Sequence, residues 1–153
     1  MSCWLVKSEP EAYSIDRLER EGRTMWEGVR NYQARNLMRD QMKVGELVLF
    51  HHSNADPPAL VGIARVASAP YPDPTQFDPA SKYFDAKATK EAPRWILVDL
   101  EFVERLPRPL PLAELKADPG LEGMELLRKG SRLSVQPVLD AHFQRVKELS
   151  ASP

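Results

Sequence analysis

The sequence predicts an α+β fold in which a small, curled, mostly antiparallel β-sheet or barrel is flanked by short helices. Two observations support this class. Short apolar runs of β-rich composition are separated by polar loops, and they do not alternate strictly with helices as in a parallel sheet. The length of 153 residues is typical of a single domain, so we treat residues 1–153 as one domain.

The N-terminal part of the chain predicts one strand and two capped helices. The apolar run 3–7 is typical of a short strand that ends before a proline. Ser14 is suited to cap a short helix, which Gly22 would end. Asn31 is suited to cap a second helix, in which apolar residues recur at three- and four-residue spacing before Gly45.

The central part predicts two antiparallel strands followed by a long loop. Residues 46–51 and 59–66 are apolar runs joined by a polar segment, and Gly62 indicates a bulge or a close backbone approach. Residues 67–93 are irregular because prolines recur in them. A loop of this length is more often functional than not, although its aromatic side chains could simply anchor it to the core. Those side chains are Tyr71, Phe77, Tyr83 and Phe84.

The C-terminal part predicts the clearest strand, a helical turn, an edge strand and a final helix. Apolar residues alternate in 94–105, and the prolines in 107–111 are expected to end that strand. Residues 112–116 could form a helical turn. The run 133–138 contains a proline, which favours an edge position, and 138–149 has the apolar spacing of an amphipathic helix.

Composition limits the classes of function. The net charge is −1, which argues against a protein that wraps long duplex DNA but not against a pocket that binds one nucleotide. The sequence has no apolar run long enough to span a membrane and no signal-peptide pattern. Its single cysteine fits a reducing compartment, so we expect a cytoplasmic protein with no membrane partner.

No sequence pattern in the chain demands catalysis, a metal or a cofactor. His51 and His52 are adjacent, so in a strand their side chains point to opposite faces and cannot share one ion. Nucleophile-elbow, zinc-binding and phosphate-binding motifs are absent. We therefore expect no metal, no cofactor and no catalytic residue, which leaves a binding pocket as the leading hypothesis.

Residues 26–36, WEGVRNYQARN, are the strongest candidate for such a pocket. They combine an aromatic ring, a neighbouring glycine, arginines and amide side chains, which together can hold a planar, hydrogen-bonding ligand such as a base. Trp26 is expected to stay partly exposed in a loop, whereas Trp4 and Trp95 are expected in the core. A loop leading into a solvated surface helix would have the same composition, so both interpretations stay open on composition alone.

Several stretches of the chain, in order from residue 3 to about residue 147, resemble the EVE domain family. They are WLVKSEP (4–10), WEGVRNYQARN (26–36), FHHSN (50–54), VGIARV (61–66) and RLSVQPV (132–138). The resemblance implies a PUA-like fold, a small mixed β-barrel with flanking helices, and a role in nucleic-acid binding. EVE domains are similar to YTH domains, which hold a methylated adenine in an aromatic cage. They are proposed to read modified bases such as methylated or hydroxymethylated cytosine.

The resemblance also implies which residues form the pocket. Trp26 would be the stacking wall, and Gly28 and Arg30 would be the adjacent rim. The other candidates are polar residues at strand ends or at the start of the second helix: Lys7, Ser8, Asn31, Tyr32, His52, Ser53, Asn54, Ser134 and Gln136. Asn31 could cap the helix instead, and His52 could be a packed or hydrogen-bonding residue at a strand end.

Two features depart from the pattern of the family. Many relatives have a tyrosine where this chain has His51, so the stacking partner differs if that ring lines the pocket. No second exposed tryptophan is expected in 67–93, and Tyr83 or Phe84 could take its place in an aromatic cage.

The leading interpretation is a non-catalytic module that binds a flipped-out, modified base in DNA or RNA. Single-stranded or mismatched sites are expected to bind better, because extruding a base from an intact duplex costs free energy. The alternative is a PUA-like hydrolase that acts on a nucleoside or modified nucleotide, with Lys7 and Glu9 as a polar catalytic pair. A third interpretation is a small-molecule sensor or a protein-interaction domain.

Overall fold

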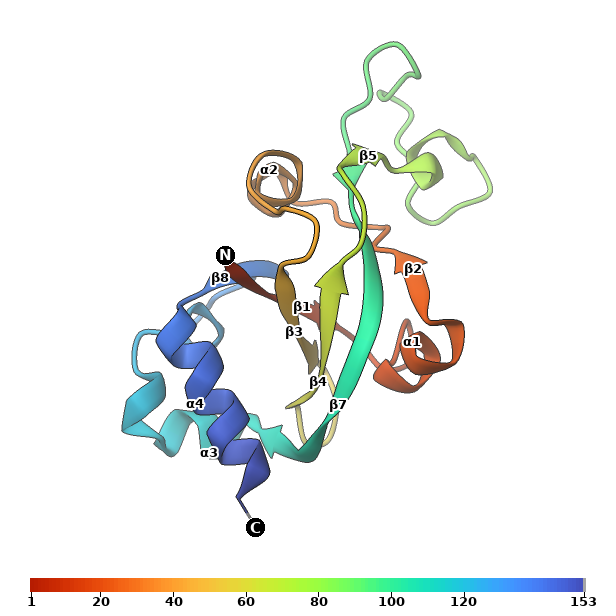
Figure 1. Ribbon diagram of the computed structural model, residues 1–153. Coiled ribbons are helices and arrows are strands. Elements are labelled where there is room, and N and C mark those ends of the chain that lie inside the picture. The colour runs from red at the N-terminus through yellow and green to blue at the C-terminus, as the bar shows by residue number, and fades with distance from the viewer. Residues whose placement is uncertain (153) are drawn as a thin grey trace.

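The fold is built on a curled six-stranded sheet in the spatial order β2-β7-β4-β3-β1-β8, with β5 and β6 paired separately (Figure 1). The computed structural model describes residues 1–152. The strands are β1 (Cys3–Ser8), β2 (Arg23–Met25), β3 (Leu47–His52), β4 (Ala59–Val66), β5 (Tyr71–Pro72), β6 (Ile96–Leu97), β7 (Asp99–Pro111) and β8 (Val135–Val138). This mixture of strands and short helices is the α+β class that the sequence predicts.

Short helices flank the sheet. The α-helices are α1 (Ile15–Glu21), α2 (Tyr32–Asp40), α3 (Leu112–Ala117) and α4 (Asp140–Ala151). The 3₁₀ helices are η1 (Pro74–Phe77), η2 (Pro119–Leu121) and η3 (Glu125–Leu127). Among residues 1–152, none of the helices combines the length and the hydropathy that crossing a membrane requires.

The pairing of the strands brings three chain segments to one edge of the sheet. Neighbouring strands are antiparallel except β1 and β3, which run parallel with Ser8 opposite His52. Their C-terminal ends therefore lie side by side. Because β8 runs antiparallel to β1, its N-terminal end reaches the same edge. The sheet stays open as a half-barrel, with β2 and β8 as its edges.

The two faces of the sheet carry separate hydrophobic clusters, as the alternation of side chains along a strand requires. Trp4, Val6 and Phe50 pack on one face with α1 and α2. Leu5 and Leu49 pack on the other face with α3 and α4, which Figure 1 shows on the side opposite to α1. Each fully buried aliphatic side chain stabilises the fold by about 1.5–3 kcal/mol.

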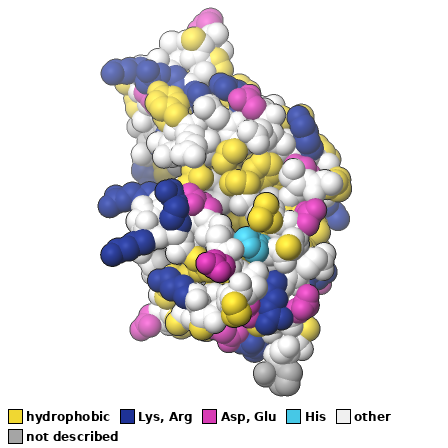
Figure 2. Space-filling view, turned by 90° about the vertical axis from the view of Figure 1, so that its left-hand side faces the viewer, with side chains coloured by type: hydrophobic (Ala, Val, Ile, Leu, Met, Phe, Trp, Pro, Cys, Tyr) yellow, Lys and Arg dark blue, Asp and Glu magenta, His cyan; other side chains and the backbone are white. Residues whose placement is uncertain are grey.

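One outer side of the molecule is partly apolar. Figure 2 shows the side that carries α2, β8 and α4, where hydrophobic side chains gather in the middle of the face. Exposed hydrophobic residues include Met1, Val44 and Leu139. The polar pocket described below lies elsewhere, next to α1 and β2.

Local signals in the sequence placed the helix caps correctly. Ser14 Oγ accepts a hydrogen bond from the Arg17 amide at 3.1 Å, and Gly22 ends α1 in a left-handed conformation. Asn31 Oδ1 accepts from the Ala34 amide at 2.9 Å. The pairing of β4 is irregular at Gly62, where an added Cβ would lie 2.6 Å from Ile15 Cδ1, so the predicted close approach is present.

Three predictions of where elements begin and end are wrong. The strand expected over 94–105 is divided at Val98 into β6, which pairs with β5, and β7. Helix α2 ends at Asp40 rather than near Gly45, and Met42 continues the buried stripe from a turn. Pro107 and Pro109 do not end β7, which runs from Asp99 to Pro111. Pro107 and Pro109 lie in residues 106–109, which bulge opposite Val61 alone, and β2 pairs only with the first residues of β7. The missing amides of these two prolines therefore break no ladder hydrogen bond.

Candidate functional site

A pocket of about 580 Å³ opens where the C-terminal ends of β1 and β3 meet the loop after β2. Four of the predicted site residues reach it from strand ends: Lys7, Ser8, Ser53 and Ser134. Three reach it from the loop after β2: Trp26, Gly28 and Arg30. Segments that are distant in sequence therefore converge on one cavity.

The strand ends are fixed by backbone hydrogen bonds that continue the sheet beyond its last pairs. The Ser53 amide donates to Ser8 O at 3.0 Å, and the Lys7 amide donates to Ser134 O at 3.0 Å. The side chains of these residues provide hydroxyl groups and one ammonium group at the floor of the pocket. Burial lowers the pKa of Lys7.

Trp26 forms a rigid part of the wall. Its backbone amide donates to Val98 O at 3.0 Å, and its ring makes edge-to-face contacts with Tyr13 and Phe50 at centroid distances of 5.9 and 5.5 Å. Only 8% of Trp26 is exposed, so the expectation of a partly exposed ring is wrong. The tight packing means that any ligand would meet a preformed aromatic surface rather than a mobile side chain.

Tyr13 is a wall residue that the sequence did not single out. It lies in the turn between β1 and α1 and lines the pocket beside Trp26. Its hydroxyl donates to Glu21 Oε1 at 2.7 Å, and the Arg17 guanidinium lies 4.8 Å from the centre of its ring. Burial raises the pKa of Tyr13 to about 12, so the phenol is protonated at neutral pH.

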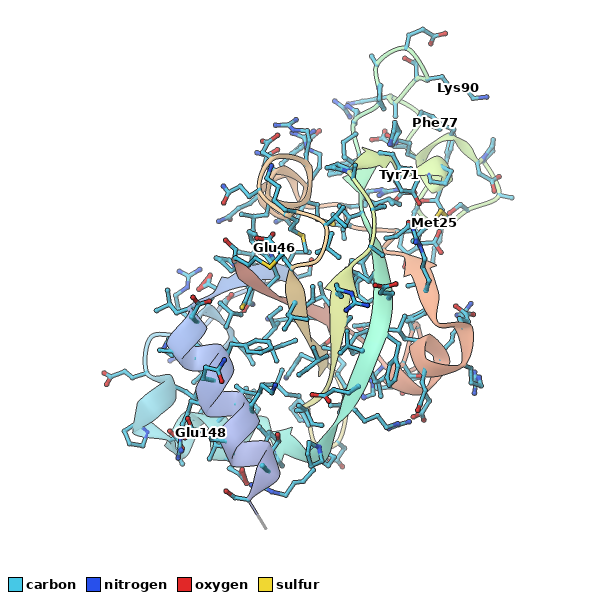
Figure 3. The ribbon with its side chains drawn as sticks, in the orientation of Figure 1. Met25, Glu46, Tyr71, Phe77, Lys90 and Glu148 are labelled. Carbon is cyan, nitrogen blue, oxygen red and sulfur yellow. The ribbon has the colours of Figure 1, made fainter. Side chains whose placement is uncertain are left out.

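The long loop 67–93 contributes Lys82 and Tyr83 to the lining of the pocket. A network centred on the buried Asp73 ties it to the segment after β2, since Asp73 Oδ2 accepts from the Gly28 amide at 2.9 Å and from Arg30 Nη1 at 3.1 Å. Arg30 Nη2 in turn donates to Tyr83 O at 2.7 Å. Figure 3 labels Met25, which lines the pocket, and Tyr71, which lies on this loop.

Tyr83 is the aromatic residue that the loop contributes. A Cβ atom on Gly28 would lie 2.5 Å from Tyr83 Cζ, so the ring rests directly on the glycine backbone. Gly28 also has φ +85°, a conformation that residues with a side chain rarely adopt. Tyr83 lines the pocket, whereas the neighbouring Phe84 is exposed and lies outside its lining. Of the two rings suggested from sequence, the structure brings Tyr83 to the site.

Three other predicted residues are engaged elsewhere and do not line the pocket. Asn31 caps α2, which is the alternative that the sequence also allowed. Tyr32 stacks on Trp95 at a centroid distance of 4.7 Å. Gln136 is buried and donates to Leu133 O at 2.8 Å, so it does not share the pocket with Ser134.

Of the residues at and after the end of β3, Ser53 lines the pocket, whereas His51, His52 and Asn54 do not. His52 Nε2 accepts from the Ile15 amide at 3.1 Å, burial lowers the pKa of His52, and the ring lies outside the lining of the pocket. His51 is buried, and it does not line the pocket. Asn54 stands outside the lining but donates through Nδ2 to Glu9 Oε1 at 2.6 Å, and Glu9 does line the pocket.

The pocket is more positive than the chain as a whole. Its lining has four cationic side chains, Lys7, Arg17, Arg30 and Lys82, and two carboxylates, which gives 4 − 2 = +2. The whole chain has a net charge of −1. Within residues 1–152, no group of three or more His, Cys, Asp or Glu side chains is arranged to hold a metal ion. Aromatic walls, hydroxyl groups and local positive charge suit a planar ligand that carries an anionic backbone.

Comparison with known proteins identifies the family. The sequence profile of the EVE domain matches residues 2–149. Thymocyte nuclear protein 1 of Gallus gallus is 42% identical, over 95% of this chain and 67% of its own length. A crystal structure from Pseudomonas putida shares 48% identity and a TM-score of 0.93, covering 97% of this chain and 99% of that chain.

One solved relative was crystallised with a ligand. The structure of human THYN1 protein in complex with 5-methylcytosine-containing DNA shares 37% identity and a TM-score of 0.93. It covers 100% of this chain and 99% of that chain. Both the sequence profile and the full-length structural match agree with the resemblance noted in the sequence. The chain therefore belongs to the EVE domain family.

Proposed function

We propose that this protein is a non-catalytic reader that binds a modified base, methylated or hydroxymethylated cytosine, in DNA. The observation that carries the proposal is the pocket itself, in which Trp26, Tyr13 and Tyr83 surround polar strand ends. The human relative in complex with 5-methylcytosine-containing DNA supports the same ligand class.

A pocket of this kind acts on a base that has left the helical stack. A volume of about 580 Å³ between fixed aromatic residues accommodates a flat ring, and stacking on an aromatic side chain is worth about 1–3 kcal/mol per base. Extrusion from a duplex opposes binding, so we propose that single-stranded or mismatched sites bind more tightly than intact duplex. A single strand of RNA presents its bases in the same way, so we propose that a modified cytosine in RNA binds as well.

A hydrolase that acts on a nucleoside or modified nucleotide is the second candidate. The specific observation in its favour is that Lys7 and Glu9 both line the pocket and that burial lowers the pKa of Lys7. A lysine with a lowered pKa in a cleft is a common feature of catalytic sites. Mass analysis of an incubated oligonucleotide separates the two functions, because a reader returns its ligand unchanged and a hydrolase does not.

The proposal is tested by titrating the protein with short single-stranded oligonucleotides while following tryptophan fluorescence. Each would carry one cytosine, 5-methylcytosine, 5-hydroxymethylcytosine or N6-methyladenine in the same flanking sequence. We expect a preference for a modified cytosine that Tyr83→Ala weakens and Phe84→Ala does not, since Phe84 is on the same loop outside the lining. Equal, weak binding of all four oligonucleotides would overturn the proposal.

A further inference from the structure

We propose that Glu9 is a specificity-determining residue, whose carboxylate accepts a hydrogen bond from the exocyclic amino group of the bound base. Glu9 would thereby make the pocket favour 5-methylcytosine over thymine, which has the same ring size and the same methyl group. This inference rests on the proposed function and specifies which edge of the base the protein recognises.

Glu9 is placed at the pocket by a turn that backbone and side-chain hydrogen bonds hold in place. It directly follows β1, and its carbonyl accepts hydrogen bonds from the amides of Ala12 and Tyr13, both at 2.9 Å. Ser8 Oγ donates to Tyr13 O at 2.7 Å and closes the same turn. One turn therefore presents an acidic side chain and an aromatic wall to the same cavity.

Asn54 orients the carboxylate from the neighbouring strand end. Its Nδ2 donates to Glu9 Oε1 at 2.6 Å. Within residues 1–152, Oε2 of Glu9 forms no hydrogen bond, so it is available as an acceptor for a ligand. Asn54 also has φ 49° and is the only residue other than glycine with a positive φ in the described chain. Asparagine tolerates this conformation better than most residues. It therefore suits a position where the backbone has a positive φ and the side-chain amide must reach Glu9.

The chemistry of a carboxylate selects an amino-bearing base. An ionised carboxylate can only accept hydrogen bonds, and cytosine offers an N4 amino group as a donor. Thymine has the carbonyl O4 at that position, so a carboxylate facing it would meet a second acceptor. Mismatched hydrogen-bonding edges of this kind change affinity by about tenfold or more.

A second carboxylate in the lining provides the internal comparison. Glu27 also borders the pocket, but its side chain forms no hydrogen bond with any residue from 1 to 152, so nothing in that part of the chain fixes its direction. Glu11 is exposed and lies outside the lining, although it is only two positions from Glu9. Glu11→Gln therefore removes one negative charge near the same turn without touching the pocket.

The test compares dissociation constants for two single-stranded oligonucleotides that differ only in 5-methylcytosine or thymine at one position. For the wild-type protein we expect a preference for 5-methylcytosine of about tenfold. Glu9→Gln should bring the two constants close together, because an amide can turn its NH₂ group toward O4. Asn54→Gly keeps the backbone conformation, removes the orienting amide and should give a smaller loss of preference. Glu11→Gln should match the wild type, and thermal unfolding would verify that all variants are folded.

The outcomes separate this inference from the proposed function. Equal binding of the two oligonucleotides by the wild type, or an unchanged preference in Glu9→Gln, would overturn the role of Glu9 while leaving a reader of modified bases intact. A preference that is lost in Glu27→Gln and kept in Glu9→Gln would show that Glu27, and not Glu9, selects the base. Absence of binding to any modified oligonucleotide would instead reject the proposed function.

Discussion

Replacing Gly28 with alanine should displace Tyr83 from the pocket and weaken ligand binding. The added Cβ would lie 2.5 Å from Tyr83 Cζ, whereas carbon atoms in contact are separated by about 3.5–4.0 Å. The ring must therefore move by about 1 Å or more, because Gly28 is held by its hydrogen bond to the buried Asp73. If the displaced ring no longer stacks on the base, affinity falls by about 1–3 kcal/mol, or roughly 5- to 150-fold.

The same substitution also strains the backbone, so a matched control is needed. Gly123 has φ +92°, close to the +85° of Gly28, but an added Cβ there would have no neighbour within 4 Å. Both variants should lose about 1–2 kcal/mol of unfolding free energy from the left-handed conformation, measured by urea denaturation. Only Gly28→Ala should weaken binding to a 5-methylcytosine oligonucleotide. Equal affinity of the two variants would refute the assignment of Tyr83 as a wall of the site.

Three further predictions test the charges around the site. Asp73→Asn removes the charge that Arg30 and Gly28 share, and it should lower the unfolding free energy by about 1–3 kcal/mol and speed proteolysis of the 67–93 loop. Burial lowers the pKa of His51 to about 4, so the unfolded chain binds a proton at a higher pH than the folded protein does. The free energy of unfolding should therefore fall as pH drops from about 6.5 towards 4. His51→Leu should flatten this pH dependence in urea titrations. Lys82→Ala should reduce the dependence of log affinity on log salt by about 0.7 for a single-stranded oligonucleotide, and an unchanged slope would exclude a phosphate contact.

Local chemistry explains why the sequence identified much of the fold. The helix caps at Ser14 and Asn31 depend on residues three positions away, so they could be recognised within a short window. The continuation of β7 through its prolines could not, because it depends on which edge of the strand is paired and on the bulge opposite Val61. Prolines end a strand only where an amide donor is needed, and that requirement is set by tertiary structure.

The candidate site also combines residues that a local motif reveals with residues whose position depends on tertiary structure. Trp26 and Gly28 stand in a distinctive motif, and the structure places both in the lining of the pocket. The burial of Trp26 follows from contacts with Tyr13 and Phe50 that the motif does not contain. Tyr13 was missed because its position depends on the turn between β1 and α1, in which its amide donates to Glu9 O. Gln136 was misplaced because residues that alternate along a strand share a face only while the strand lasts, and Ser134 precedes β8.

The pocket formed by Trp26, Tyr13 and Tyr83 is proposed to bind a modified cytosine. The most direct measurement is a fluorescence titration of the wild-type protein and Tyr83→Ala with single-stranded oligonucleotides that carry either cytosine or 5-methylcytosine at one position. We expect tighter binding of the methylated oligonucleotide by the wild type and a loss of that binding in Tyr83→Ala. Equal affinity of the wild type for both oligonucleotides, or unchanged binding in the variant, would contradict this proposal.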